Sequence, residues 1–161
     1  MHAGRILAAH PGQTAFLSRN ATMSHNGTIL YTGKTFTTGD RERQSRSSDN
    51  RLDIELSPPG SAGMGTNPEQ LLAAGWSACF IGAMGSAARE LGVRLPADAW
   101  VAAEVDLIND PEEGFFLQAR LQVSLPGLDL TLAQSIADLA HQLCPYSKAT
   151  RGNIQVLITA L

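Results

Sequence analysis

The sequence predicts an α+β domain, in which short strands surround two long helices. Three observations support this prediction. A strong helix start precedes the uncharged residues 71–88, apolar residues recur at helical spacing in residues 132–143, and short runs rich in Ile, Val, Thr and Phe lie before and after both helices. The chain has 161 residues, of which 43% are hydrophobic, so it is long enough for one domain with a buried core.

The segment before the first helix predicts two strands and two loops. Residues 28–38 are rich in Ile, Tyr, Thr and Phe and predict a strand, and residues 52–56 alternate apolar with charged side chains, which is typical of a half-buried strand. The arginine-rich residues 40–48 predict a polar loop between these strands. Residues 58–65 are rich in Pro and Gly and predict a plain connector, because the Gly-Lys-Ser/Thr of a phosphate-binding loop does not follow them.

The first long helix is predicted to begin after Asn67 and to run to about Leu91. Asn67 is a suitable N-cap, Pro68 fits the first turn, and Gly92 stops the helix. Residues 71–88 carry no charge and reach the minimum length of a membrane span, but they are mostly Ala, Gly and Ser and lack suitable aromatic or basic flanks. We therefore expect a helix buried on all sides and no membrane partner.

Glycines within this helix predict close approach by another element, most simply a second helix. Each glycine costs a helix about 1 kcal/mol relative to alanine, and a close backbone contact would offset that cost. The three glycines are Gly75, Gly82 and Gly85.

The C-terminal half predicts two strands, a helix and a last strand. Residues 100–108 and 115–125 read as strands, the second with every other side chain apolar from residue 115 to residue 125. Large apolar residues within 132–143 are spaced four, three and four apart and predict a helix. Residues 154–158 predict the last strand.

Charge and composition exclude several classes of protein. The net charge of -3 and the pI near 5.7 give no support for a nucleic-acid partner. The first apolar run is too short and too interrupted for a secretory signal, so we expect a cytoplasmic protein. Residues 1–27 predict an N-terminal arm ahead of a domain at residues 28–161, and Met23 is a second candidate start, which would make residues 1–22 an upstream extension.

Cys79 and Cys144 are the only thiols in the chain, too few for a secreted disulfide scaffold. Cys79 lies in the middle of the first predicted helix, where the helix dipole gives little help to a thiolate, so a cation is needed to stabilise it. Cys144 lies in the last turn of the second helix, where the dipole disfavours a thiolate. This asymmetry suits an attacking thiol and a second thiol that resolves it, and two inert buried thiols are the alternative.

Other readings of the thiols and histidines have less support. Residues 144–147 resemble the glutaredoxin active-site motif, but they follow a helix and not a strand, and a Cys-x-x-Cys motif is excluded because residue 147 is serine. His141 and Cys144 have a spacing at which they could share a metal, but no third and fourth ligands are evident, so we expect no metal.

An arginine run and one glutamate are the charged candidates. The arginines read mostly as solvated loop residues, but one guanidinium could fold over a thiol and stabilise its anion. Glu69 suits the positive end of the helix dipole and could orient that arginine through a bidentate pair. The arginines of the run are Arg41, Arg43, Arg46 and Arg51.

Three motifs together resemble the organic hydroperoxide resistance protein family, within the superfamily of osmotically inducible protein C. They are TNPEQL at residues 66–71, SACFIGA at residues 77–83 and CPYSKATRGN at residues 144–153, and the resemblance extends from residue 29 to the C-terminus. It implies antiparallel sheets around long buried central helices and an intertwined homodimer. It also implies that the protein works without metal, flavin or haem.

The resemblance further implies a thiol peroxidase that reduces alkyl or fatty-acid hydroperoxides to alcohols in oxidative stress defence, with a dithiol reductant of the lipoyl type. Cys79 matches the peroxide-attacking cysteine and Cys144 the resolving cysteine, with a Cys79 sulfenic acid and a Cys79–Cys144 disulfide as intermediates. Glu69 matches the family glutamate, and Arg41 matches the family arginine although Asp40 replaces a glycine beside it. Two arginines are fallback candidates, Arg43 and Arg46.

Apolar neighbours of Cys79 are candidates for a pocket that holds an alkyl or acyl tail, with core packing as the alternative. They are Trp76, Phe80, Ile81 and Met84. Glu69 lies ten positions before Cys79, which is about 15 Å along a continuous helix. Because one straight helix cannot bring the two together, we expect Glu69 to act from the partner chain of a homodimer.

Two other classes of function stay open from the sequence. A peroxide sensor or binding module would be oxidised once and read by a partner, with slow or absent turnover. A structural domain would hold thiols that never meet, and it would form no Cys79–Cys144 disulfide after peroxide treatment.

Overall fold

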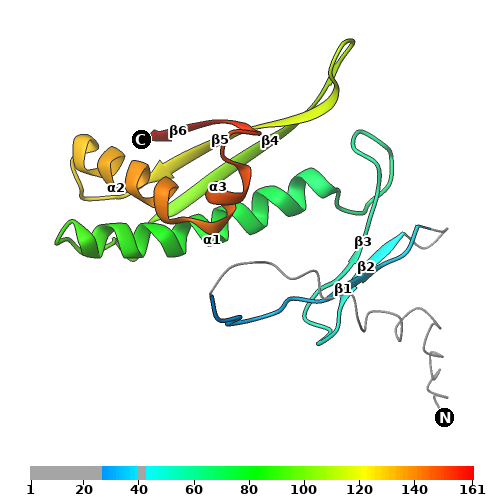
Figure 1. Cartoon of the computed structure of the whole chain (residues 1–161), viewed down its shortest axis with the longest axis horizontal. Helices are drawn as coiled ribbons and strands as arrows, with labels where there is room; N and C mark the ends of the chain where they lie inside the picture. The colour runs from blue at the N-terminus through cyan, green and yellow to red at the C-terminus, as the bar shows by residue number, and fades with distance from the viewer. Residues whose placement is uncertain (1–26, 40–42) are drawn as a thin grey trace. The chain divides into compact units, whose positions relative to one another are not determined.

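The structure, a computed structural model, describes residues 27–39 and 43–161 (Figure 1). The chain divides into a first unit, Met1–Gly65, and a second unit, Thr66–Leu161. Each unit has its own three-stranded sheet. The predicted arm lies outside the described residues except for Gly27, so the boundary between arm and domain stays a prediction.

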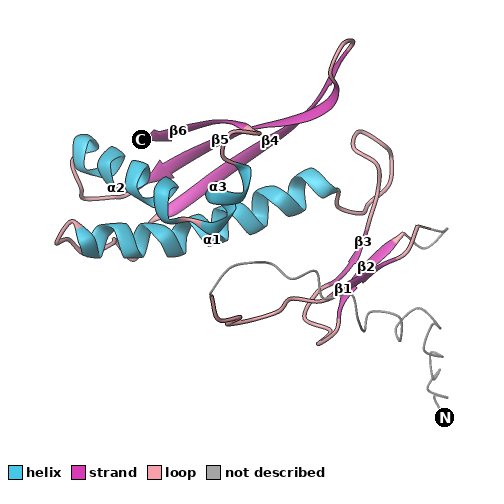
Figure 2. Cartoon of the chain, viewed as in Figure 1, coloured by secondary structure: helices cyan, strands magenta, loops and turns pink. Residues whose placement is uncertain are grey.

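The first unit forms an antiparallel sheet in the order β1-β2-β3 (Figure 2). The strands are β1 (Thr35–Thr37), β2 (Gln44–Ser47) and β3 (Asp53–Glu55). Their side chains are mostly polar, and the sheet is tied together by cross-strand contacts such as that between the hydroxyls of Thr37 and Ser45, 2.9 Å apart.

Two predictions for this unit are corrected. The first strand is shorter than residues 28–38, because only Thr35–Thr37 pairs with a neighbouring strand. The prediction of a loop over residues 40–48 is wrong for Gln44–Ser47, which forms the central strand β2. Its arginine content obscured the alternation, since Ser45 is buried while Arg46 pairs with Asp53 on β3 at 2.9 Å. The strand predicted at residues 52–56 is confirmed as β3.

The second unit packs helices on one face of a sheet (Figure 1). Its elements in chain order are α1 (Pro68–Glu90), β4 (Trp100–Asp110), β5 (Gly114–Ser124), α2 (Leu130–Leu143), α3 (Pro145–Thr150) and β6 (Gln155–Ala160). The sheet order is β4-β5-β6. Strands β4 and β5 are antiparallel, but β6 runs parallel to β5 after a crossover through α2 and α3. The α+β class is confirmed, and the expectation of purely antiparallel sheets is corrected for β6.

Helix α1 begins and ends where its sequence predicts. The Asn67 side chain accepts a hydrogen bond from the Gln70 backbone N–H at 2.8 Å, and Pro68 occupies the first turn. Leu91 caps the C-terminal end, and Gly92 follows with a φ of +74°, a conformation that favours glycine.

One face of α1 is buried and the other is exposed, so the expectation of burial on all sides is wrong for the single chain. The buried face carries six side chains: Trp76, Phe80, Ala83, Met84, Ala87 and Ala88. On the opposite side Ala78, Ile81 and Gly82 are exposed. Among the described helices, α1 alone is long and apolar enough to cross a membrane, but its buried face packs against β4 and α2.

The core of the described residues lies within the second unit, between α1, α2 and the sheet. Inward side chains of β5 such as Leu121 and Val123 meet Ile136 and the alanines of α2. The β4–β5 hairpin extends past the helices (Figure 1), and there the alternation continues without burial, since Phe115 is 72% exposed.

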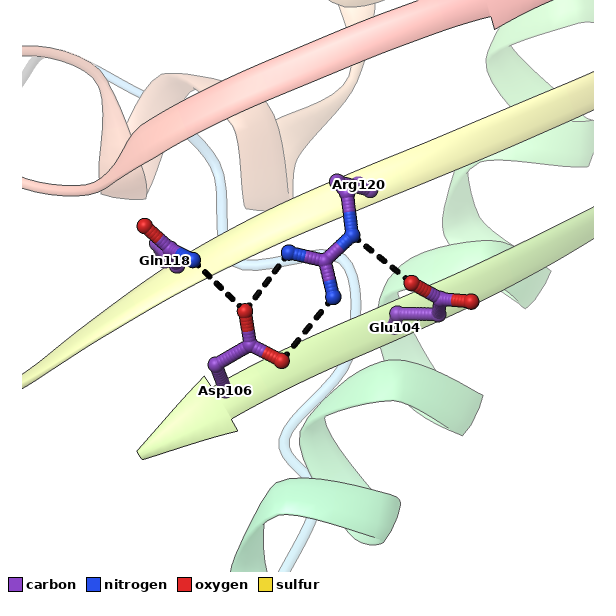
Figure 3. Close-up of polar contacts among 4 residues, drawn as sticks. All are labelled: Glu104, Asp106, Gln118 and Arg120. Carbon is purple, nitrogen blue, oxygen red and sulfur yellow. Dashed lines mark hydrogen bonds and ion pairs between the residues drawn. The ribbon is translucent and has the colours of Figure 1, made fainter. Parts of the chain in front are cut away.

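The outer face of the same sheet carries a polar cluster of four residues: Glu104, Asp106, Gln118 and Arg120 (Figure 3). Arg120 donates two hydrogen bonds to the Asp106 carboxylate, at 2.6 and 2.9 Å, and one to Glu104 at 2.7 Å. The hydrogen bonds from Arg120 and then from Gln118 lower the pKa of Asp106 to about 2. Every charge in the cluster is paired, so the cluster fixes the pairing of β4 with β5.

Candidate active site

The two thiols of the chain meet inside the second unit. The sulfur of Cys144 lies 3.5 Å from the sulfur of Cys79, although 65 positions separate them in the sequence. Cys144 is fully buried and Cys79 is partly exposed, and both are free thiols. A disulfide has an S–S distance of about 2.0 Å, so the two sulfurs must come about 1.5 Å closer to be joined.

Cys144 lies at the junction of α2 and α3, of which the sequence predicted only the end of α2. It was predicted in the last turn of the second helix, but α2 ends at Leu143, and Cys144 is both the C-cap of α2 and the N-cap of α3. Proline is favoured at the first position of a helix, and here Pro145 starts α3. The signal for α3 was therefore present in the Cys-Pro pair.

The surroundings of Cys79 favour the neutral thiol. Burial raises the pKa of Cys79 above its ordinary value, the backbone N–H of Tyr146 opposes this shift, and the neighbouring Cys144 adds to it. The N–H of Tyr146 belongs to the first turn of α3, so this helix supplies a donor that the sequence analysis missed. A reactive thiolate at Cys79 still needs a cation beside it.

Two contacts hold α3 against α1 next to the thiols. The indole N–H of Trp76 donates to the hydroxyl of Ser147, at 3.2 Å between Nε1 and Oγ, and both side chains are fully buried. A Cβ added at Gly75 would lie 2.8 Å from the Tyr146 hydroxyl, so Gly75 leaves room for that ring. The predicted close approach thus exists at Gly75, though the neighbour is a tyrosine side chain of α3.

The other two glycines have open space around them in the single chain. A Cβ at Gly82 or Gly85 would meet nothing within 4 Å among the described residues. No described element of this chain approaches these two glycines, so a close neighbour for them stays a prediction.

Three of the four predicted pocket residues belong to the core. Trp76, Phe80 and Met84 are fully buried in the packing between α1 and the rest of the second unit. Ile81 is 38% exposed and lies on the outer side of α1. Core packing, the alternative reading, therefore describes the first three side chains in this chain.

Glu69 lies on the same continuous helix as Cys79, one residue after the N-terminal Pro68. Its Oε2 is buried and has no hydrogen-bond partner among the described residues. A buried carboxylate oxygen without a partner is costly, so this position calls for a donor.

The arginine candidates lie in different settings, and one of them is outside the described residues. Arg41 and Asp40 lie outside the described residues. Arg43 lies in an exposed segment with a φ of 23°. Arg46 is engaged with Asp53.

Within the described ranges, no three His, Cys, Asp or Glu side chains gather closely enough to hold a metal ion. His141 lies on the last turn of α2, and its Nδ1 is buried without a partner there. Burial lowers the pKa of His141, and the nearby charge of Arg151 adds to this shift.

Comparison with known proteins identifies the family. A family model described as OsmC-like protein matches residues 59–159. The chain is 46% identical over 135 residues to an organic hydroperoxide resistance protein of Xanthomonas axonopodis pv. citri (strain 306), an alignment that covers 81% of this chain and 94% of the relative. It is 40% identical over 131 residues to the organic hydroperoxide resistance protein OhrB of Bacillus subtilis (strain 168), covering 79% and 95% of the two chains.

Solved structures agree with these relatives. The crystal structure of OhrB of Bacillus subtilis superposes with a TM-score of 0.77 at 39% identity, covering 83% of this chain and 100% of that one. The protein therefore belongs to the OsmC-like family, among the organic hydroperoxide resistance proteins.

Proposed function

We propose that this protein is a thiol peroxidase that reduces organic hydroperoxides, of alkyl or fatty-acid type, to alcohols. The observation that carries the proposal is the 3.5 Å contact between the sulfurs of Cys79 and Cys144, in a chain that belongs to the organic hydroperoxide resistance proteins. A thiol that attacks peroxide leaves a sulfenic acid, and a second thiol in contact with it can condense with that acid.

The cycle has three steps. The Cys79 thiolate attacks one peroxide oxygen, the O–O bond breaks, and the other oxygen leaves with a proton as an alcohol. Cys144 then attacks the sulfenic sulfur, so that an S–S bond forms, an S–O bond breaks and water leaves. A dithiol reductant, of the lipoyl type by family resemblance, opens the disulfide by exchange and is itself oxidised to a disulfide.

The thiolate needs a cation, because burial raises the pKa of Cys79. We propose Arg41 for this role on the family resemblance, with Glu69 as the carboxylate that orients it. The buried Oε2 of Glu69 without a partner supports a nearby donor such as a guanidinium. Since Glu69 and Cys79 are ten positions apart on one continuous helix, Glu69 serves the thiol of the partner chain in this proposal.

A homodimer is part of the proposal, and the outer side of α1 supports it. Ala74, Ala78, Ile81 and Gly82 are exposed there, without a charged residue among them. An uncharged side of a helix that the rest of the second unit leaves uncovered suits a two-fold contact. Ile81, the exposed member of the predicted pocket set, is our candidate for contact with an apolar tail. The proposed location is the cytoplasm.

Turnover with a dithiol tests the proposal. The rate of peroxide consumption is measured for wild type and for Cys79→Ser, each with cumene hydroperoxide and with hydrogen peroxide as substrate, in the presence of dihydrolipoamide. We expect fast consumption of cumene hydroperoxide that exceeds that of hydrogen peroxide and disappears in Cys79→Ser. A single round of oxidation without turnover would favour a peroxide sensor, and no oxidation of either thiol would leave a structural role.

A further inference from the structure

The buried hydrogen bond between Trp76 and Ser147 stands out among the contacts of the second unit. Ser147 is one of three buried polar residues among those described, the others being Ser45 and Thr150. An unpaired hydroxyl or indole N–H in the core costs free energy, so each of these side chains satisfies the other. Because breaking this buried bond would leave both groups unpaired, the bond restricts the position and orientation of α3 on α1.

The bond and the thiol contact join the same two segments. Trp76 lies three residues before Cys79 on α1, and Ser147 lies three residues after Cys144 at the start of α3. Residues three apart on a helix share a face, so Trp76 points to the side of α1 that also carries Cys79. The 3.2 Å hydrogen bond is thus a second connection beside the 3.5 Å sulfur contact.

Two other polar links between α1 and the start of α3 involve the thiols themselves: the sulfur contact and the hydrogen bond from the Tyr146 backbone N–H to Cys79. Apart from these, the bond between Trp76 and Ser147 is the one side-chain hydrogen bond that joins α1 to α3 within the described part of the chain. The ring of Tyr146 contributes packing over Gly75, and packing tolerates small shifts that a hydrogen bond does not. Among the polar contacts that do not involve the thiols themselves, the bond between Trp76 and Ser147 is therefore the one that ties α3, and with it Cys144, to α1.

We propose that Trp76 and Ser147 are positioning residues for the disulfide-forming step: they hold the Cys144 end of α3 against Cys79 after Cys79 has become a sulfenic acid. This inference rests on the proposed peroxidase cycle. In the step concerned, the Cys144 sulfur bonds to the Cys79 sulfur, the S–O bond of the sulfenic acid breaks, and the thiol proton leaves with the hydroxyl as water. Neither Trp76 nor Ser147 takes part in the earlier attack on the peroxide.

The test follows the two steps separately in Ser147→Ala. The reduced protein is mixed with one equivalent of cumene hydroperoxide, quenched at short times with a dimedone-type sulfenic acid trap, and measured by intact mass. We expect Cys79 to be oxidised at the wild-type rate, while condensation slows about tenfold, as loss of one buried hydrogen bond implies. The trapped sulfenic acid, scarce in wild type, accumulates in the variant.

Three further variants separate positioning from general damage. Ser147→Thr keeps the hydroxyl and restores condensation. Ser135→Ala, which loses a hydroxyl bonded to the Thr131 carbonyl on α2, leaves both steps unchanged. The double variant Trp76→Phe/Ser147→Ala slows condensation no more than the slower of the two single variants does, because both substitutions remove the same hydrogen bond.

The outcomes distinguish this inference from the proposed function. Condensation at the wild-type rate in Ser147→Ala, equal slowing of both steps, or additive effects of the two substitutions would overturn the positioning role and leave the peroxidase cycle intact. A wild-type protein that never forms the sulfenic acid or the disulfide overturns the cycle itself and the positioning role with it.

Discussion

Oxidation of the thiol pair should stabilise the protein against unfolding. A Cys79–Cys144 disulfide would close a loop across 65 positions of the chain. In the chain-entropy model a loop of this size lowers the entropy of the unfolded state by an amount worth about 4 kcal/mol at 25 °C. The sulfurs already lie 3.5 Å apart in the reduced protein, so little native-state strain should offset this gain.

The assay compares thermal unfolding of the protein reduced by a dithiol with that of the protein oxidised by one equivalent of cumene hydroperoxide. For a chain of this length a stabilisation of about 4 kcal/mol raises the Tm by roughly 10 °C. Cys144→Ser is the matched control, because it cannot form the disulfide and should show no such rise.

Mass measurement under non-reducing conditions confirms that the disulfide has formed before the unfolding curves are compared. An oxidised protein that carries the disulfide but unfolds at or below the Tm of the reduced protein would contradict the reasoning. It would mean that closing the bond requires a rearrangement of α3 whose cost cancels the entropic gain.

Other parts of the structure make separate predictions. Asn67→Ala removes the side chain that caps α1 and should lower the free energy of unfolding by about 1 kcal/mol in urea titrations, and unchanged stability would mean that the cap is not needed. Asp106 has a pKa of about 2 in the folded protein, below its unfolded value, so its contribution to stability is complete above the unfolded pKa and is lost as the pH falls through about 2. Asp106→Asn should therefore remove part of the acid-induced loss of stability. If the free energy of unfolding falls with the same slope against pH in wild type and in the variant, the lowered pKa of Asp106 is refuted. His141 has a lowered pKa, so its ring should stay neutral in NMR titrations to a pH below the ordinary histidine value, and a normal titration would show that the ring is open to solvent.

Most of the second unit could be predicted from its sequence because its signals are local. Asn67, Pro68 and Gly92 mark the ends of α1 through capping and through a backbone conformation that favours glycine. The alternation in residues 115–125 identifies β5, and burial follows it from Ala119 onward. At Phe115 burial fails, because the hairpin passes beyond the helices that would cover it, and sequence alternation carries no information about where the cover ends.

The parts that were missed depend on pairing between distant segments. Strand β2 is polar on both faces, so only its hydrogen bonds to β1 and β3 define it. Helix α3 is too short for a periodic pattern, and its start was hidden in a Cys-Pro pair that also ends α2. The bond between Trp76 and Ser147 joins residues 71 positions apart, and nothing in the local sequence around either residue predicts the other as its hydrogen-bond partner.

The two thiols of the candidate site could be singled out from the sequence, but their geometry could not. The settings of Cys79 and Cys144 in the sequence suggested different roles for the two thiols, and the fold brings their sulfurs together. The donor from Tyr146 could not be foreseen, because it comes from the backbone of α3. The sequence could not separate residues that line a pocket from residues of the core, since both use the same apolar residue types.

In the proposed cycle, Cys79 attacks the peroxide and Cys144 resolves the product. The most direct test of this cycle is the intact mass of wild type and of Cys144→Ser after one equivalent of cumene hydroperoxide. We expect wild type to lose two hydrogens as the disulfide closes, and Cys144→Ser to gain one oxygen at Cys79 that a dimedone-type trap captures. Hydroperoxide consumption with both thiols still free, or an oxygen found on Cys144 in Cys79→Ser at the wild-type rate, would contradict it.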